Sequence, residues 1–242
     1  MHRAALCLLV ATLSESVNFV PNFKKCDRRR PDLHECVLQT SRQVLPQLAR
    51  PSFDLPNLDP LEIPQITIKS GGGSVAVDQT YRNCKMYGLL GVKIERFEFD
   101  FGAKTIAGAA FFPKVDVRCE YKMDGKILLL PVRGEGQATI RLENLKTGSF
   151  IRFKEIRKKG KTFLKFLTTE LNIDPGHVSF DFENLFDGDK QLGDNFNQVL
   201  NDNWKEVFDD VKGNLIETFS QILLGMAGNF FGNFPLEELF DN

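Results

Sequence analysis

Histidine is scarce in this chain, and the motifs of familiar enzyme classes are missing. Only His34 and His177 lie beyond the first few residues, and no cysteine or histidine pair has the spacing of a zinc site. There is no G-x-S-x-G nucleophile elbow. The segment SGGGS at 70–74 lacks the Gly-Lys-Ser/Thr that a phosphate loop needs, so we interpret it as a turn. We therefore expect no metal, no cofactor and no catalysis. An esterase in particular would need a nucleophile activated by a base, and the sequence does not indicate such a pair.

The net charge is close to zero, and the polar aromatic residues Tyr and Trp are few. The formal net charge is −1, so no strong field recruits nucleic acid. Phenylalanine dominates the aromatics, with 22 Phe against three Tyr and one Trp. Phe fills volume without requiring a hydrogen-bond partner. A Phe-rich interior is therefore either a dry core or a dry cavity, and composition does not separate the two.

Long apolar runs are absent, and the N-terminal one is short. Arg3 precedes an apolar stretch at 4–13, followed by the small residues Ser14 and Ser16. This pattern is typical of a secretory signal peptide, and the run is too short to span a bilayer. We predict a signal peptide over residues 1–16 and a single secreted domain over 17–242. The alternative is an N-terminus that is disordered or packed into the core.

Cleavage there would remove Cys7 and leave four cysteines, an even number that fits an oxidising compartment. Four cysteines allow three pairings. Cys26 and Cys36 close a short loop near the mature N-terminus, and we expect them to be bridged.

A second bridge follows from a hairpin argument. Two predicted strands, 92–99 and 104–112, meet at a turn at Phe101-Gly102, so that paired residue numbers sum to about 203 and Phe97 faces Ile106. The same register, extended, places Cys84 opposite Cys119, within disulfide reach. Shifts in apolar parity near Glu95 and Pro113 indicate bulges that would change the register. Two buried free thiols are the alternative.

Periodicity divides the rest of the chain into a strand-rich part and a helical end. A short helix is predicted at 30–49, ended or kinked by Pro46, and a proline-rich stretch at 51–66 follows as an extended linker toward the first strand. Roughly eight half-buried strands alternate over 66–182. From Asp187 to Phe231 one apolar stripe continues at helical spacing without proline, which predicts a single long helix.

These elements predict an α+β fold in which a strongly curved antiparallel sheet wraps around one long C-terminal helix, with a short N-terminal helix. The alternative, a flat sheet with the helix across one face, would expose the second half of the helix, which is apolar on several sides. A sheet curled around such a helix encloses a long apolar interior, which can hold an apolar ligand.

A basic cluster lies around the predicted turn at 157–161. It comprises Arg152, Lys154, Arg157, Lys158, Lys159, Lys161 and Lys165. One interpretation is a solvated hairpin tip. The other is a surface attracted to an anionic membrane or a receptor, and this is the alternative to a carrier function.

Several segments resemble the takeout and juvenile-hormone-binding protein family of insects. They are FKKCDRRRPDLHECVLQTSRQVLPQLA at 23–49, LDPLEIPQI at 58–66, YKMDGKILLLPVRGEGQA at 121–138, ENLFDGDKQLGDNFNQVLNDNWKEVF at 183–208 and FFGNFPLEELF at 230–240. The C-terminal motif is long and specific, and the resemblance covers essentially the whole predicted mature chain.

This resemblance implies the tubular sheet-and-helix fold, secretion into haemolymph or sensory lymph, and binding of juvenile hormone, a related terpenoid or a fatty compound in an internal tunnel. It also implies the Cys26–Cys36 disulfide. A later disulfide of the hormone-binding members is absent, because no cysteine follows Cys119. The chain therefore resembles the takeout branch more than a dedicated hormone carrier.

We predict a monomer that binds its ligand with apolar side chains from both helices and the sheet, entered where the first helix meets the sheet. Candidate polar groups that orient the ligand are Tyr81, Tyr87, Tyr121 and Asn203. Trp204 is expected to pack helix against sheet or to line the cavity. The predicted wall residues are Leu33, Val37, Phe97, Phe99, Ile106, Tyr121, Phe196, Val199 and Phe219.

Overall fold

The computed structural model describes residues 23–47, 55–70 and 73–241. The predicted signal peptide at 1–16 lies outside the described residues. The helices are α1 (Leu33–Val44), α2 (Lys190–Asp202), α3 (Trp204–Asn233) and α4 (Leu236–Leu239), with 3-10 turns at Leu45–Gln47, Leu89–Gly91 and Phe186–Gly188. The strands are β1 (Cys26–Asp27), β2 (Leu61–Ile68), β3 (Val75–Tyr87), β4 (Lys93–Asp100), β5 (Thr105–Ile127), β6 (Leu130–Lys158), β7 (Lys161–Asp174), β8 (His177–Phe182) and β9 (Phe240–Asp241).

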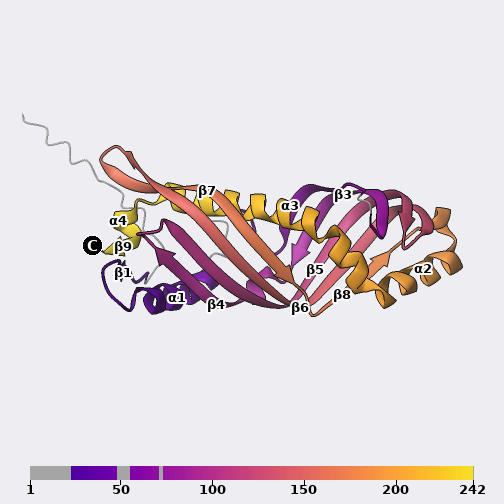
Figure 1. Ribbon diagram of the computed structural model, residues 1–242, viewed down its shortest axis with the longest axis horizontal. Coiled ribbons are helices and arrows are strands. Elements are labelled where there is room, and N and C mark those ends of the chain that lie inside the picture. The colour runs from indigo at the N-terminus through magenta and orange to yellow at the C-terminus, as the bar shows by residue number, and fades with distance from the viewer. Residues whose placement is uncertain (1–22, 48–54, 71–72, 242) are drawn as a thin grey trace, which may run out of the picture.

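Two very long strands, β5 and β6, form an antiparallel hairpin that runs the length of the molecule (Figure 1). The sequence predicted shorter strands here, such as 104–112, and the structure joins them into continuous ones. Along β5, the strand β4 pairs with residues 105–111 and β3 with residues 116–127. Along β6, β8 pairs with residues 138–143 and β7 with residues 146–158. Each long strand therefore pairs with two different strands along the edge that faces away from the other long strand.

The sheet consequently has two lobes that share β5 and β6. The first lobe contains β4 and β7 and is covered by α1; the second contains β2, β3 and β8 and is flanked by α2 (Figure 1). Each lobe has its own buried apolar cluster. Among the buried apolar positions of β5, Ile106 has an even number, whereas those from Val115 to Ile127 have odd numbers. The pairing of β5 with β6 continues past Pro113 without a shift, so both strands exchange faces where the lobes meet.

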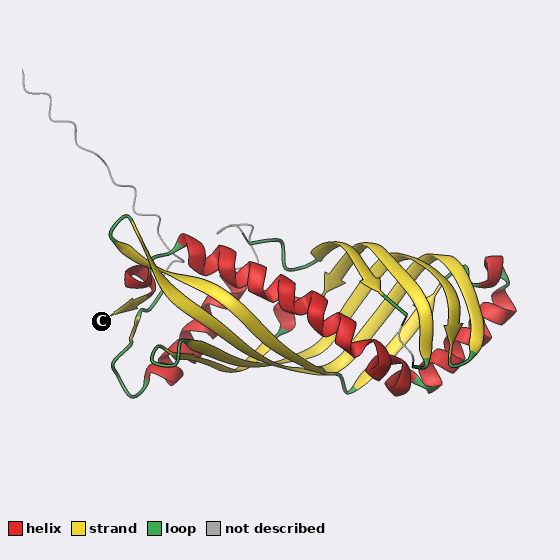
Figure 2. Ribbon diagram, turned by 45° about the horizontal axis from the view of Figure 1, so that its top comes forward, coloured by secondary structure: helices red, strands yellow, loops and turns green. Residues whose placement is uncertain are grey.

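Antiparallel pairing, strong curvature and a helix in the hollow confirm the predicted fold class, and the sheet is not closed (Figure 2). The prediction of one uninterrupted helix was wrong. Asn203 has φ −113° and ψ 24°, and it separates α2 from α3. The carbonyl oxygen of Val199, in the last turn of α2, accepts hydrogen bonds from the side-chain Nδ2 of Asn203 at 2.8 Å and from its backbone nitrogen at 3.2 Å. The apolar stripe continues across this break, which is why periodicity alone did not reveal it.

The helix α2 lies beside β8, whose only partner strand in the described chain is β6. The side-chain amide of Asn201 accepts from the backbone nitrogen of Phe180 at 2.7 Å and donates to its carbonyl oxygen at 2.8 Å. Asn197 makes the same two bonds with Phe182, each at 3.0 Å. Two asparagines thus satisfy backbone groups of β8 as a neighbouring strand would.

Both predicted cysteine pairs are bridged in the structure, with Cα–Cα distances of 5.8 Å for Cys26–Cys36 and 4.2 Å for Cys84–Cys119. The register used to reach the second pair was wrong for β4, because Phe99, and not Phe97, faces Ile106. The expected irregularity at Glu95 is present, between Ile94 and Arg96. Cys84 instead lies on β3, which pairs with β5 farther along and places Cys84 opposite Cys119 at a bulge.

Candidate ligand-binding site

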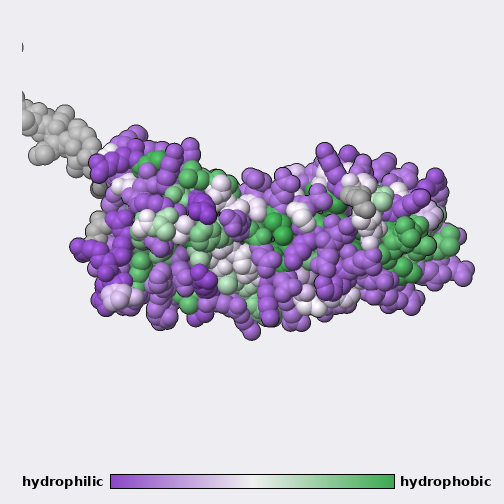
Figure 3. Space-filling model, in the orientation of Figure 1, coloured by the Kyte–Doolittle hydropathy of each residue, from purple (hydrophilic) through white to green (hydrophobic). Residues whose placement is uncertain are grey.

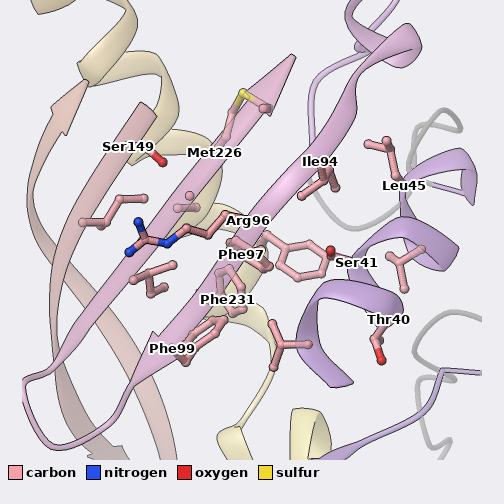
Figure 4. A pocket seen from close by; sticks show the side chains of 18 of the residues that line it. Thr40, Ser41, Leu45, Ile94, Arg96, Phe97, Phe99, Ser149, Met226 and Phe231 are labelled. Carbon is pink, nitrogen blue, oxygen red and sulfur yellow. The ribbon is translucent and has the colours of Figure 1, made fainter. Parts of the chain in front are cut away.

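Each lobe contains a cavity lined mainly by apolar side chains. The first cavity, of about 350 Å3, lies between α1, β4, the first half of β5 and the C-terminal part of α3. Figure 4 shows side chains from α1, β4 and α3 converging on it, among them Thr40, Phe97 and Phe231. The second, of about 390 Å3, lies between the curved sheet of the second lobe and α3. Both volumes fall in the range of small-molecule sites, about 300–1,000 Å3.

The two cavities adjoin at the middle of the molecule. Five residues line both: Ala110, Thr147, Ser149, Leu223 and Met226. Thr147 donates its hydroxyl hydrogen to the carbonyl oxygen of Ala110 at 3.3 Å, which satisfies one polar group at this junction. The side chain of Met226 is the longest and most flexible of the five, and a thioether adapts readily to the shape of a neighbour.

The helix α1 forms one wall of the first cavity because two links hold it against the sheet. The Cys26–Cys36 disulfide fixes its first turns, and Arg42 in its last turn reaches β4. Its buried face, which includes Val37, Thr40 and Val44, turns toward the cavity. The hydroxyl of Thr40 donates to the carbonyl oxygen of Lys24 at 3.3 Å, and the hydroxyl of Ser41 donates to the carbonyl oxygen of Leu38 at 2.8 Å. The two hydroxyls that α1 contributes to the cavity lining therefore both donate to backbone oxygens.

Charged groups are nearly absent from the two cavities in the described chain. Arg96 lines the first cavity, its guanidinium is half exposed, and its Nε donates to the Glu98 carboxylate at 2.8 Å. By contrast, the face of the molecule seen in Figure 3 is mostly hydrophilic, with apolar side chains appearing in patches. The two cavities thus offer apolar surface to a ligand.

The structure brings together only part of the predicted wall. Val37, Phe97, Phe99 and Ile106 line the first cavity, and Phe219 lines the second. Leu33 and Phe196 are buried in the apolar clusters and line neither cavity. Val199 is half-buried on α2, also away from both. The role of these residues in ligand binding stays a prediction.

The four polar residues predicted to orient the ligand lie in different places in the structure. Tyr81 lines the second cavity, whereas the hydroxyl of Tyr121 donates to the carbonyl oxygen of Glu183 at 2.7 Å outside it. Burial, with the nearby Glu183, raises the pKa of Tyr121 to about 12. Tyr87 lies under the guanidinium of Arg118, 5.2 Å from its ring centre, and Asn203 ends α2. Trp204 contacts His177 edge to face, at 5.2 Å between ring centres, and packs on the apolar cluster of the second lobe.

Sequence reasoning did not find Gln79, Thr147, Ser149 or Met226. Gln79 is buried in β3 at an inward position of the alternating pattern, and this parity was the signal available. No metal-binding group of histidine, cysteine and acidic residues occurs in the described chain, and no helix within these ranges is long and apolar enough to cross a membrane.

A curved sheet that holds a long helix, with apolar cavities between them, is an architecture suited to binding proteins for small apolar molecules. The chain belongs to the haemolymph juvenile hormone binding protein family, whose family model matches residues 5–241. This membership confirms the resemblance inferred from the sequence motifs.

Two relatives share the description "circadian clock-controlled protein daywake". The protein from Drosophila yakuba is 27% identical over 259 residues, covering 99% of this chain and 98% of its own. The one from Drosophila melanogaster is 28% identical over 201 residues, covering 79% and 76%. The crystal structure of takeout 1 from Epiphyas postvittana superposes with a TM-score of 0.81 at 24% identity, covering 90% of this chain and 99% of that one, which supports the fold.

Proposed function

We propose that this protein is a secreted, non-enzymatic carrier that holds a small hydrophobic molecule in one internal tunnel formed by the two cavities. The observation that carries the proposal is the junction, where the same five residues line both cavities. Juvenile hormone, a related terpenoid or a fatty compound has the required apolar character. Membership of a family named for a haemolymph hormone-binding protein supports both the ligand class and secretion.

Burial of the ligand's apolar surface would drive binding. A terpenoid that buries ~400 Å2 gains on the order of 10 kcal/mol at about 25 cal/mol per Å2. Losses of translational and conformational freedom remove several kcal/mol, which leaves micromolar to nanomolar affinity. The side chains of Phe97, Phe99 and Phe219 offer apolar surface to the ligand and carry no polar group that would lose hydrogen bonds to water on binding.

Native mass spectrometry of the purified protein, with organic extraction of co-purifying molecules, tests the proposal. We expect either a bound hydrophobic molecule or uptake of one from a panel of terpenoids and fatty compounds. An unliganded mass together with no uptake from the panel would contradict the carrier. Size-exclusion chromatography with light scattering tests the expected monomer.

A second candidate function, docking to an anionic membrane, is favoured by one observation. On the outer face of the β6–β7 hairpin, Lys154 pairs across the strands with Lys165, and Lys158 with Lys161. Ile156 and Phe163 lie between these pairs. Like charges opposite one another destabilise a sheet, and an anionic surface would relieve that repulsion. Lys161 is compensated by Glu238 at 2.8 Å, but Lys154 and Lys165 have no ion pair within the described chain.

Sedimentation with phosphatidylserine vesicles tests this second function. Binding should fall steeply with added salt and in the variant K154Q/K165Q, while K69Q/K126Q, which removes two exposed lysines elsewhere, should bind like the wild type. Equal binding of the two double variants would contradict docking through the hairpin. Salt-insensitive binding would contradict an electrostatic mechanism.

A further inference from the structure

Two polar side chains are buried side by side in the second cavity. Gln79 and Tyr81 lie two positions apart on β3, so both point to the same face of the sheet. Both line the cavity, with 5% and 4% of their surfaces exposed. The hydroxyl of Tyr81 donates a short hydrogen bond to the side-chain oxygen of Gln79. Apolar neighbours, including Ile68, line the cavity around them.

This hydrogen bond leaves the amide nitrogen of Gln79 unused. Within the described chain, the only hydrogen-bond partner of the Gln79 side chain is Tyr81. A primary amide carries two N–H donors, and a buried donor without an acceptor is unfavourable. Because the phenol occupies the amide oxygen, the amide is oriented with its donors free. An acceptor supplied by a ligand would satisfy them.

The surroundings favour an uncharged acceptor. No Asp, Glu, Lys, Arg or His is among the described residues that line the second cavity. Burial, and secondarily Tyr121, raises the pKa of Tyr81 above its ordinary value, so the phenol stays neutral and keeps its donor. An ionised carboxylate in this cavity would lose its hydration without gaining a cation.

We propose that Gln79, oriented by Tyr81, is the recognition site for an uncharged hydrogen-bond acceptor, an ester or ketone oxygen, on a ligand whose chain extends toward Met226, and that this cavity discriminates against an ionised carboxylate. The proposal rests on the proposed carrier function. Gln79 pairs with Met123, well along β5 from the junction residue Ala110, so an acceptor bound here leaves the remaining cavity to the apolar chain.

Three probes of equal chain length test it: a long-chain methyl ester, the free acid and the parent hydrocarbon. Their affinities are measured near neutral pH by displacement of a fluorescent hydrophobic probe. We expect the wild type to bind the ester at least about tenfold more tightly than the acid. In Gln79→Met, which keeps the side-chain volume without the donors, ester affinity should fall about tenfold while hydrocarbon affinity is unchanged or increases.

Tyr81→Phe provides a second variant, because it removes the bond that orients Gln79 but not the donors themselves. It should weaken ester binding less than Gln79→Met does. Gln65→Leu, on the outward face of β2, is the matched control and should bind all three probes like the wild type. Thermal unfolding shows whether each variant is folded.

Two outcomes would overturn the recognition site while leaving the carrier intact: an acid bound as tightly as the ester, or a Gln79→Met variant that loses ester and hydrocarbon binding equally. If the wild type binds none of the three probes and does not bind the fluorescent probe either, the carrier function itself falls, and this proposal with it.

Discussion

Arg42 donates two hydrogen bonds to the carbonyl oxygen of Ile94, from Nε at 2.9 Å and from Nη2 at 2.7 Å. The bonds join the last turn of α1 to β4 beside the bulge that follows Ile94. With the Cys26–Cys36 disulfide at the other end, they fix α1 as a wall of the first cavity.

Replacing Arg42 with alanine should loosen this wall without unfolding the protein. The guanidinium is exposed, so we expect the free energy of unfolding to fall by only about 1 kcal/mol. Amide hydrogen exchange over residues 33–44 should accelerate while exchange in β5 stays unchanged, as mass spectrometry can measure. His34→Ala, exposed on the same helix, is the control. Unchanged exchange in α1 would show that Arg42 does not hold the helix.

Replacing Met226 with tryptophan should separate the two cavities. The larger ring would fill the junction that Met226 shares with Ser149 and Leu223. Extra volume costs typically about 1–3 kcal/mol in stability. In displacement assays, ligands long enough to occupy both cavities should bind at least about tenfold more weakly, and short ligands should be little affected. Met226→Leu keeps the volume and should behave like the wild type. Equal losses for long and short ligands would contradict a continuous tunnel.

Replacing Asn201 with alanine should destabilise the second lobe. The variant leaves the backbone nitrogen and oxygen of Phe180 without their side-chain partners, which lie at 2.7 and 2.8 Å in the native protein. We expect a loss of about 2–3 kcal/mol in the free energy of unfolding, measured by urea denaturation. Gln198→Ala, exposed on the same helix, should change stability by less than about 0.5 kcal/mol. A similar loss in both variants would contradict the stabilising role assigned to the two Asn201 hydrogen bonds, because alanine favours the helix at both positions.

Asp116 should contribute to the pH dependence of stability. Burial raises its pKa, but hydrogen bonds from Arg141 at 2.8 Å and from Lys114 outweigh burial and hold the pKa below its ordinary value. The folded state therefore binds this proton less readily than the unfolded state. The resulting stabilisation is complete above the ordinary carboxyl pKa of about 4 and is lost as pH falls through the lower folded value.

In Asp116→Asn the free energy of unfolding should consequently decline less steeply below about pH 4 than in the wild type. Chemical denaturation at a series of pH values measures this slope. Asp202→Asn, exposed at the end of α2, is the control and should reproduce the wild-type slope. An Asp116→Asn slope as steep as that of the wild type would contradict the assignment.

Several local features were predictable because their causes are local. Alternation in β3 and β8 identified strands, and the parity change near Glu95 identified the bulge in β4. Pro46 marked the end of the first helix, since proline lacks the donor that a helix interior needs. By contrast, the stretch around Pro64 was predicted as a linker and is part of β2, an edge strand, where proline is tolerated.

The site was less predictable, because a cavity depends on which inward side chains leave space between them. Phe99 and Phe196 are both inward Phe residues, yet only Phe99 lines a cavity. Phe196 packs edge to face with Phe186 at 5.5 Å between ring centres. Gln79 occupies an inward position of the alternating pattern of β3, but alternation does not show that its side chain borders a cavity.

The sequence by itself determined where most strand-forming and helical stretches lie and which of their faces are apolar, because apolar spacing follows directly from the backbone geometry of each element. Only the tertiary structure decided that β3 and β4 share one long partner, so that Cys84 meets Cys119 by a different register from the one that joins Phe99 to Ile106. Alternation specifies a face of the sheet but not the strand beside it, and strand pairing is a contact between residues far apart in the chain.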